Sequence, residues 1–319
     1  MSRTIRHESA AFRAMGTDVH LIAVGPDAEL AVGLGEWRVH ELEAMWSRFL
    51  PDSEISRLNA AGGAAFPVSP ETGMLIAAAI EGWRLTDGAF DPCVLPYLED
   101  AGYDRDFGDI EDHSEDCMED GNKDGAASTR SPPAWSPSQC GMIDVDRNDG
   151  TVRLPQGAQI DAGGVAKGFA ADLLVAELRD HDVVGLCMNL GGDVRVWGRS
   201  PDSPRWRVEV MHPVTDEQLA VLEVDDCGLV TSTPLKRQWT ARSEPQHHLI
   251  DPGTGRPASS RWSQVTVIAS NATRAEILSK AVFLRAEAGL ALLEHDGASA
   301  LLLAEDGTLQ EVGLGDDDG

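Results

Sequence analysis

Residues 160–169, Ile160-Asp161-Ala162-Gly163-Gly164-Val165-Ala166-Lys167-Gly168-Phe169, have the pattern of a buried strand end, a glycine turn and a helix start. We expect the helix to run from near Lys167 through Leu178. Glycines at such a turn let the backbone approach a ligand closely, and the N-terminus of a helix favours an anion. The helix dipole repels a lysine in the first turn unless an anion such as phosphate lies there. The stretch therefore indicates a phosphate-binding turn. A tight turn with a solvated lysine is the alternative.

This turn is one of a series of short motifs along the chain. They are Met15-Gly16-Thr17, 47–59 (SRFLPDSEISRLN), 88–92 (GAFDP), 161–168 (DAGGVAKG), 189–193 (NLGGD), 231–232 (TS), 248–255 (HLIDPGTG) and 263–267 (SQVTV). In kind and order they resemble the ApbE family of FAD:protein FMN transferases. The resemblance covers about residues 12–305, nearly the whole chain, and implies one flavin transferase domain over that range.

The composition is that of a strongly acidic protein. The 319 residues include 53 Asp and Glu against 26 Lys and Arg, which gives a formal net charge of −27, and 42% of them are hydrophobic. This charge argues against nucleic acid, which is bound by clustered Lys and Arg, and against attraction to anionic lipid. An acidic, lysine-poor chain suits a high-salt cytoplasm, so a halophilic source is one hypothesis. An ordinary acidic protein from a GC-rich genome is the other.

The cysteines and the first residues bear on the compartment. Five cysteines are widely spaced: Cys93, Cys117, Cys140, Cys187 and Cys227. They form no CxxC pair, so the spacing is neither a zinc pattern nor an even disulfide framework. Residues 1–8 lack the apolar run of a signal peptide, and no later stretch would span a bilayer. Many members of the resembled family are exported, but here we expect a cytoplasmic protein without membrane insertion.

Hydrophobic periodicity predicts helices mixed with short strands. A strand is expected over 19–24, a long helix over 28–49, and a second helix from Ser69, with Pro70 in its first turn. A late helix is expected over about 273–294. Strands are expected over 184–188, 206–211, 219–224, 265–269 and 298–303. The mixture predicts an α+β fold with a mixed, largely antiparallel sheet and flanking helices, in two closely joined lobes around an FAD cleft.

Residues 104–140 differ in composition from the rest of the chain. Between Asp104 and Asp124, ten residues are acidic and two are basic, and 128–137 are rich in Ser and Pro. Such a segment buries too little apolar surface to offset its ordering entropy, so we predict a mobile insertion. The family usually has a more ordered helical stretch here. Residues 315–319 form an acidic tail.

The resemblance implies that FAD is the substrate and that an acceptor hydroxyl attacks its FMN-side phosphorus and expels AMP. Such phosphoryl transfer depends on positioning and charge neutralisation. Backbone donors and a positive charge for the pyrophosphate are expected from Gly163, Gly164, Ala166 and Lys167. Asp161 would orient this turn or contact FAD, or it would cap the helix.

A histidine is the candidate base. His248 and Asp251 belong to a motif that the family keeps near the pyrophosphate, and histidine titrates near neutral pH. Asp251 would orient His248, or the Asp-Pro pair would only start a turn. His247 is adjacent, but His248 matches the motif position.

Two further side chains are expected at the flavin ring. Met15 and Phe49 occupy positions where the family packs the ring. At Phe49 the family commonly has tyrosine, so stacking is kept and a hydroxyl is lost. A role for Phe49 in the apolar core is the alternative. Asp193, in the 189–193 turn, either contacts the ligand or accepts backbone N–H bonds.

The expected metal site is altered. The family binds Mg²⁺ through an aspartate, a threonine four residues later and a backbone carbonyl, here matched by Glu276, Lys280 and Ala166. The spacing keeps Glu276 and Lys280 on one helical face, but an ammonium cannot ligate Mg²⁺ and repels it. A Glu276–Lys280 surface pair is the simplest alternative. Ser279 is adjacent to the lost hydroxyl but points about 100° away on a helix.

Two consequences of this substitution remain open. Either the Lys280 ammonium takes over part of the role of the metal, or the protein binds FAD without catalysis. A third alternative is an FAD pyrophosphatase that uses water and releases FMN and AMP. By resemblance, the partner of a transferase would be an acceptor flavoprotein whose FMN-binding domain carries a Ser/Thr target motif.

Overall fold

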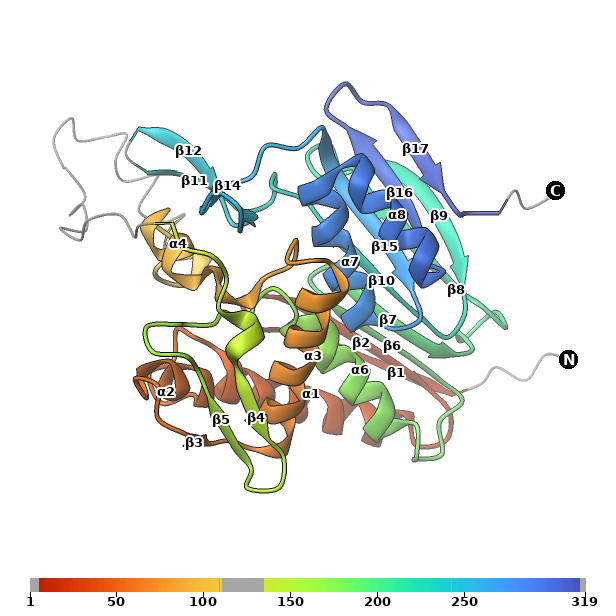
Figure 1. The fold of residues 1–319 in the computed structure, drawn as a ribbon. Coiled ribbons are helices and arrows are strands. Elements are labelled where there is room, and N and C mark those ends of the chain that lie inside the picture. Colours follow the sequence, from red (N-terminus) through yellow and green to blue (C-terminus); the bar gives the residue numbers. More distant parts are fainter. Residues whose placement is uncertain (1–5, 109, 111–134, 242, 316–319) are drawn as a thin grey trace, which may run out of the picture. The chain divides into compact units, whose positions relative to one another are not determined.

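A computed structural model describes residues 6–108, 110, 135–241 and 243–315 (Figure 1). The chain divides into two compact units. The first contains 1–46, 163–233 and 261–319, and the second contains 47–162 and 234–260. The domain predicted over 12–305 thus comprises two units, each built from segments far apart in sequence. None of the described helices combines the length and the apolar character that a membrane span needs.

The first unit is built on an eight-stranded sheet that is antiparallel throughout its described strands. Its order is β1 (His7–Ala14), β2 (Thr17–Val24), β6 (Gly185–Leu190), β7 (Asp193–Gly198), β10 (Cys227–Ser232), β15 (Trp262–Ala269), β16 (Ser299–Ala304) and β17 (Leu309–Val312). Strands β1 and β2 are joined by a two-residue turn in which Met15 and Gly16 both have positive φ. Such turns suit the twist of a hairpin.

Helices cover one face of this sheet (Figure 1). They are α1 (Ala28–Trp46), α6 (Ala166–Leu178), α7 (Ala272–Arg285) and α8 (Glu287–Asp296). The opposite face packs against the hairpin of β8 (Trp206–Met211) and β9 (Gln218–Val224), because Trp206 and Val224 share a core cluster with Val194 and Val196. Side chains alternate along a strand, so Asp193 and Arg195 of β7 point to the helical face.

The second unit contains short elements. They are α2 (Glu54–Ala60), β3 (Phe66–Pro67), α3 (Pro70–Leu85), η1 (Pro92–Val94), α4 (Leu95–Asp100), η2 (Cys140–Met142), β4 (Asp144–Asp146), β5 (Thr151–Arg153), β11 (Gln238–Ala241), β12 (Glu244–His247), β13 (Ile250–Asp251) and β14 (Arg256–Pro257). Strands β3, β5 and β4 form one sheet, and the last four strands form two hairpins. A cluster of Leu98, Tyr103, Trp239 and Ile250 provides one core of the unit.

The α+β class is confirmed, and three predicted elements are corrected. Helix α1 ends at Trp46 and leaves Phe49 in a turn, because Pro51 disfavours helical backbone at the residue before it. The predicted late helix is two helices, broken at Ala286 with φ 45°. Gly289 allows the second helix to pack closely against the first, since a Cβ there would lie 2.6 Å from the Val282 Cα.

Ile160 is buried as predicted but lies outside any strand.

Only the ends of the predicted insertion lie within the described residues; 109 and 111–134 lie outside them, as do 316–319 of the predicted tail. Phe107 and Ile110 pack against the core cluster around Trp239. At the other end, the Trp135 indole donates to the Pro252 carbonyl at 3.0 Å, and the Ser136 N–H donates to the Tyr97 hydroxyl at 3.0 Å. The described ends are therefore anchored in the second unit.

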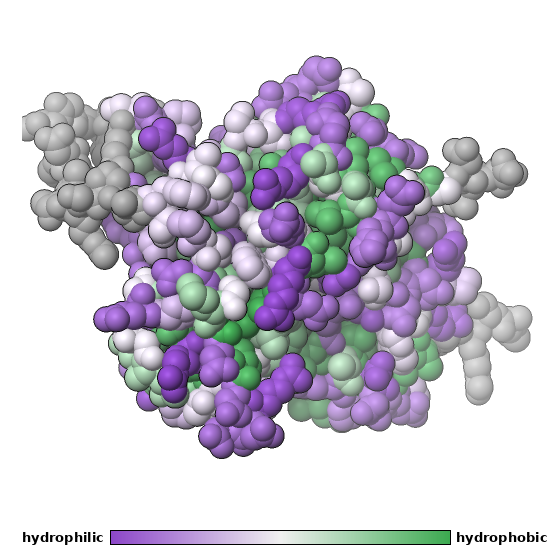
Figure 2. Space-filling view, in the orientation of Figure 1, coloured by the Kyte–Doolittle hydropathy of each residue, from purple (hydrophilic) through white to green (hydrophobic). Residues whose placement is uncertain are grey.

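Hydrophilic residues cover much of the visible surface (Figure 2). This agrees with the acidic composition, since charged side chains are almost always exposed unless they are paired. A charged side chain that is buried in this protein is therefore expected to have a partner that stabilises its charge.

Candidate functional site

The N-terminus of α6 lies at the predicted phosphate-binding turn. Gly163 and Gly164 lie in the turn before the helix, and Val165 is the N-cap, without a side-chain cap bond. Asp161 is therefore not the N-cap residue of this helix, and its role at the turn stays a prediction. Gly168 has a role the sequence did not suggest: a Cβ there would lie 2.6 Å from the Ala272 carbonyl oxygen. This glycine permits close contact between α6 and α7.

Lys167 lies in a buried network of four charges. Its ammonium pairs with the Asp193 carboxylate and lies 3.4 Å from Glu276 Oε1. The Lys280 ammonium lies 3.1 Å from the same Oε1. The side chains of Glu276, Asp193, Lys167 and Lys280 are 0%, 5%, 16% and 15% exposed. Glu276 and Lys280 thus share a helical face, as expected, but they are not a surface pair, and Lys167 is not a solvated lysine.

The pKa values in this network follow from burial and pairing. Burial opposes ionisation of Glu276, but the Lys167 and Lys280 ammoniums and the Gly168 N–H outweigh it and hold the pKa of Glu276 below its usual range. Burial raises the pKa of Asp193 despite the attraction of Lys167. Two ammoniums and two carboxylates give the network a formal charge of zero.

The donor set does not fit Mg²⁺. This cation takes oxygen ligands in near-octahedral geometry, and carboxylates normally offset its charge. Here the Glu276 carboxylate already bonds to two ammoniums and the Gly168 N–H at 2.8 Å. The hydroxyl of Ser279 is bonded to Ser232 at 2.7 Å and supplies no ligand. A divalent ion beside Glu276 would be repelled by both ammoniums.

Helix α7, which carries Glu276 and Lys280, is fixed at its N-terminus. Asn271 is the N-cap and accepts from the Arg274 N–H. Asp172 of α6 accepts from the Ala272 and Thr273 N–H groups at 2.9 and 2.8 Å. A carboxylate here also satisfies the helix dipole. These caps tie α6 to α7 and fix the position of the network.

The 189–193 segment forms the turn between β6 and β7. Asn189 accepts from the Gly192 N–H at 2.8 Å, as a turn-forming side chain does. Gly191 has φ 69°, and a Cβ there would lie 2.0 Å from the Thr17 hydroxyl, so only glycine fits. The Asp193 carboxylate pairs with the Lys167 ammonium instead of capping backbone N–H groups of the turn, and its contact with a ligand stays a prediction.

In the second unit, Asp161 pairs with an arginine that the sequence analysis had not singled out. Arg48 Nε lies 3.4 Å from Asp161 Oδ1, and both side chains are largely buried. The Arg48 guanidinium also lies over the rings of Phe49 and Tyr103, at 4.2 and 4.7 Å from their centroids. The RF pair in the 47–59 motif was the available signal for this cation–π contact.

The two predicted flavin contacts lie in different surroundings. Phe49 is half-buried and its ring centroid is 5.8 Å from that of Tyr103, so it takes part in the apolar core as the alternative proposed. Met15 lies in the β1–β2 turn of the first unit, and its N–H donates to Glu43 Oε1 at 2.6 Å. Whether either meets a flavin stays a prediction.

The histidine pair divides into two environments. The Leu249 N–H donates to His247 Nδ1 at 3.2 Å, and His247 Nε2 lies 3.0 Å from the Ala258 carbonyl. Burial lowers the pKa of His247. A neutral ring that donates through Nε2 satisfies both bonds. His247 is therefore structural, and His248, which is half-buried, remains the candidate base.

Asp251 shapes a turn. Its Oδ1 accepts from the Gly253 N–H at 2.9 Å, and its Oδ2 accepts from the Thr254 hydroxyl at 3.2 Å. Among the described residues, its bonds all stay within this turn, and none joins it to His248. The turn interpretation of the Asp-Pro pair is confirmed, and the expectation that Asp251 orients His248 is not met.

The predicted residues thus form two sets. The first unit holds Met15, Gly163, Gly164, Ala166, Lys167, Glu276 and Lys280, and the second holds Phe49, Asp161, His248 and Asp251. Within the first set, Lys167, Glu276 and Lys280 come together with Asp193. Within the second, Asp161 and Phe49 meet at Arg48.

Known proteins resemble this chain along most of its length. A curated FAD:protein FMN transferase of Treponema pallidum (strain Nichols) is 30% identical over 332 aligned residues, which cover 95% of this chain and 86% of that protein. The crystal structure of an ApbE protein from Thermotoga maritima superposes with a TM-score of 0.80 at 24% identity and covers 96% of this chain and 97% of its own.

The apo form of the Pseudomonas stutzeri flavinyl transferase ApbE superposes with a TM-score of 0.79 at 25% identity, and the match covers 99% of each chain. The sequence profile described as the ApbE family matches residues 15–302. That range includes the α6 turn, the four-charge network and the histidine pair. The chain belongs to the ApbE family.

Proposed function

We propose that this protein transfers the FMN part of FAD to a Ser or Thr hydroxyl of an acceptor flavoprotein and releases AMP. The observation that carries the proposal is the family match over residues 15–302, together with a curated FMN transferase at 30% identity. In this reaction the acceptor oxygen bonds to the FMN-side phosphorus while the bond from that phosphorus to the bridging oxygen breaks. AMP leaves with the bridging oxygen.

The start of α6 supports a pyrophosphate site. The first N–H groups of a helix have no partner within it and favour an anion. The carboxylates of Asp193 and Glu276 would repel such an anion if they were uncompensated. Lys167 and Lys280 cancel their formal charge, and these are two of only four lysines in the chain. The network therefore permits an anion next to two buried carboxylates.

His248 is the proposed base for the acceptor hydroxyl. Its neighbour His247 has both ring nitrogens engaged in backbone bonds, and His248 is the member of the pair that matches the motif position of the family. Histidine is the side chain most often used as a general base, because an imidazole can take up and release a proton at neutral pH. Asp251 takes no part in this step.

The four-charge network also affects how far the reaction should depend on Mg²⁺. Since two ammoniums already meet the Glu276 carboxylate, we expect FAD binding and transfer to depend little on Mg²⁺. A metal ion normally stabilises the negative charge of a transferred phosphoryl group by placing positive charge beside it. Fixed ammoniums also carry positive charge, so they can supply part of this stabilisation.

One observation favours a second candidate function. Lys280 occupies the position that the resemblance gives to a magnesium ligand, and an ammonium cannot coordinate a metal. If catalysis in this chain required that metal, the protein would bind FAD without transferring FMN.

The decisive experiment combines the purified protein, FAD and an FMN-binding acceptor domain with a Ser/Thr target motif, in Mg²⁺ or chelator and over a salt series. Acceptor mass and released AMP are measured. A covalent FMN adduct supports the transferase. AMP without an adduct indicates a hydrolase, and bound FAD with neither product indicates a binding protein. His248→Ala should slow transfer by about 10²–10⁴-fold, and His247→Gln is the matched control for loss of an imidazole.

A further inference from the structure

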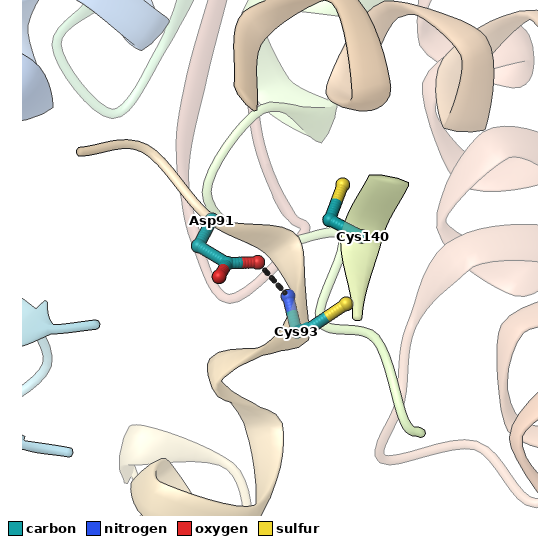
Figure 3. Close-up of side chains that lie close together, drawn as sticks. All are labelled: Asp91, Cys93 and Cys140. Carbon is teal, nitrogen blue, oxygen red and sulfur yellow. Dashed lines mark hydrogen bonds between the residues drawn. The ribbon is translucent and has the colours of Figure 1, made fainter. Parts of the chain in front are cut away.

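A cluster of potential metal ligands lies in the second unit and takes no part in the proposed reaction. Asp91 precedes η1, Cys93 lies within it, and Cys140 starts η2 (Figure 3). One carboxylate oxygen and the two sulfurs lie within 4.8 Å of one another. Their sequence spacing indicated no zinc site, because 47 positions separate the two cysteines. The fold brings them together.

The carboxylate in this cluster has no cationic partner. Asp91 is 8% exposed. It accepts from the Cys93 N–H at 2.8 Å, and the Ser138 side chain is a further hydrogen-bond partner. Neither bond brings a positive charge, and no Lys or Arg in the described part of the chain pairs with it. Burial accordingly raises the pKa of Asp91. A buried carboxylate is costly unless it is paired or bound to a metal.

The two thiols of the cluster lie close together. Cys140 is fully buried and Cys93 is half-buried. Hydrogen bonding to Cys140, burial and the charge of Asp91 all raise the pKa of Cys93. A divalent ion would reverse this balance, because a coordinating thiol loses its proton.

The geometry suits a small, thiophilic ion. Three atoms within 4.8 Å of one another have a common centre no more than about 2.8 Å from each, and Zn²⁺ lies about 2.3 Å from sulfur and 2.0–2.2 Å from oxygen. A shift of about half an ångström would close the site. Asp91 and Cys93 also line a cavity of about 210 Å³, which gives access and room for a water as fourth ligand.

We propose that Asp91, Cys93 and Cys140 bind Zn²⁺ through one carboxylate oxygen and two thiolates, with a water from the cavity as fourth ligand. Each thiol releases its proton to solvent on binding, so the ion and three anionic ligands leave a site of charge −1. A disulfide between the cysteines is the competing use of the pair. It would leave the Asp91 carboxylate uncompensated, whereas Zn²⁺ compensates it.

The proposed site would brace the segment that carries Asp161. The Pro92 carbonyl, between two of the ligands, accepts from the Asp161 N–H at 2.8 Å. Zinc would also link η1 to η2, which follows the part of the chain outside the described residues. The role is therefore structural and independent of any FMN transfer.

Zinc binding is tested on the full chain, reduced and stripped of metal. Cys117→Ser is introduced in all samples, because Cys117 lies outside the described residues. Zinc content is measured after dialysis against Zn²⁺ with excess Mg²⁺, and Co²⁺ is added separately to reveal thiolate-to-metal charge transfer. Cys93→Ser, Cys140→Ser and Asp91→Asn are compared with Cys227→Ser, a matched cysteine in the first unit. Asp91→Asn keeps the oxygen that accepts from the Cys93 N–H.

We expect one Zn²⁺ per chain, a Co²⁺ thiolate band, and an increase in Tm with Zn²⁺. Each of the three ligand variants should weaken zinc binding by more than about tenfold, and Cys227→Ser should not change it. Absence of the thiolate band, or equal zinc binding by Cys93→Ser and Cys227→Ser, would overturn the proposal. A Cys93–Cys140 disulfide would also overturn it, if the protein as purified without reductant contains that bond and no zinc.

Discussion

Two buried clusters that contain acidic side chains differ in whether basic side chains balance their charge. In the first unit, Asp193 and Glu276 are matched by Lys167 and Lys280. In the second, Asp91 lies beside two thiols without an ammonium or guanidinium partner among the described residues. The carboxylates of the first group are already paired with ammoniums, although the resemblance places a metal at this position. The second has the ligands for a metal although its sequence spacing suggests none.

The comparison shows why ligand identity alone does not establish a metal site. A carboxylate attracts a cation only as far as its charge is still uncompensated by its neighbours. Glu276 and Asp91 are both almost fully buried, so the difference between them lies in their partners. Replacing each by its amide tests this directly.

The largest effect is expected for Glu276→Gln. Removing this charge leaves two ammoniums buried with one carboxylate, and breaking a buried pair costs about 3–5 kcal/mol of the free energy of unfolding. Glutamine can still accept from the Gly168 N–H, so the loss reports on charge. Urea denaturation measures it, with the exposed Glu294→Gln as control, expected within about 0.5 kcal/mol. An equal effect of the two substitutions would show that the network is not electrostatically coupled.

A smaller effect is expected when the network is converted to an oxygen-ligand set. In Glu276→Asp/Lys280→Thr, one ammonium is replaced by a hydroxyl, which restores an arrangement suited to Mg²⁺. We expect FMN transfer by this variant to be at least about tenfold faster in Mg²⁺ than in chelator, or about 1.4 kcal/mol. Rates of adduct formation measure it. No change in metal response relative to the wild type would remove the assignment of these positions to the metal site of the family.

For Asp91→Asn in metal-free, reduced protein, the expected change in unfolding free energy is below about 1 kcal/mol. Its carboxylate has no ion pair to lose, and asparagine keeps the bond to the Cys93 N–H. Chemical denaturation in chelator measures it. A loss as large as that expected for Glu276→Gln would mean that a charge outside the described residues compensates Asp91.

The smallest effects are expected in the pH dependence of stability, where the two carboxylates should have opposite signs. The pKa of Asp91 is raised above its ordinary 3.8, so its contribution to stability falls as pH rises past that value. The pKa of Glu276 is lowered from 4.5, so its contribution is present above that value and is lost as pH falls. Differences in unfolding free energy between the wild type and each amide variant, measured over pH, give the two slopes. Slopes of the same sign would contradict the comparison.

The sequence predicted the elements that have a strong local signal. Helix α6 begins within one residue of its prediction, helix α3 has the predicted Ser69 cap, and strand β8 matches at both ends. The break at Ala286 was missed because the apolar pattern continues through it, and strand β1 because its exposed, polar face lacks a clear pattern. The apolar pattern of one segment does not show which other helix or strand will pack against it.

The site was predicted less completely for the same reason. The resemblance grouped Ala166, Glu276 and Lys280 at one site. The burial of Glu276 and Lys280 and the pairing of Lys167 with Asp193 depend on how α6, α7 and β7 pack. The Arg48–Asp161 pair joins two motifs more than 100 positions apart. Cys93 and Cys140 likewise meet only through the packing of η1 and η2. Such pairings follow from tertiary contacts, which residue spacing does not specify.

The most direct test of the account is the rate of FMN transfer by the wild-type protein in Mg²⁺ and in chelator, followed by acceptor mass. Because the ammoniums of Lys167 and Lys280 already meet the carboxylates of the network, we predict adduct formation in both conditions, with rates within about twofold of each other. An adduct that forms only in Mg²⁺ would contradict the account, because it would require a metal where the structure places two cations.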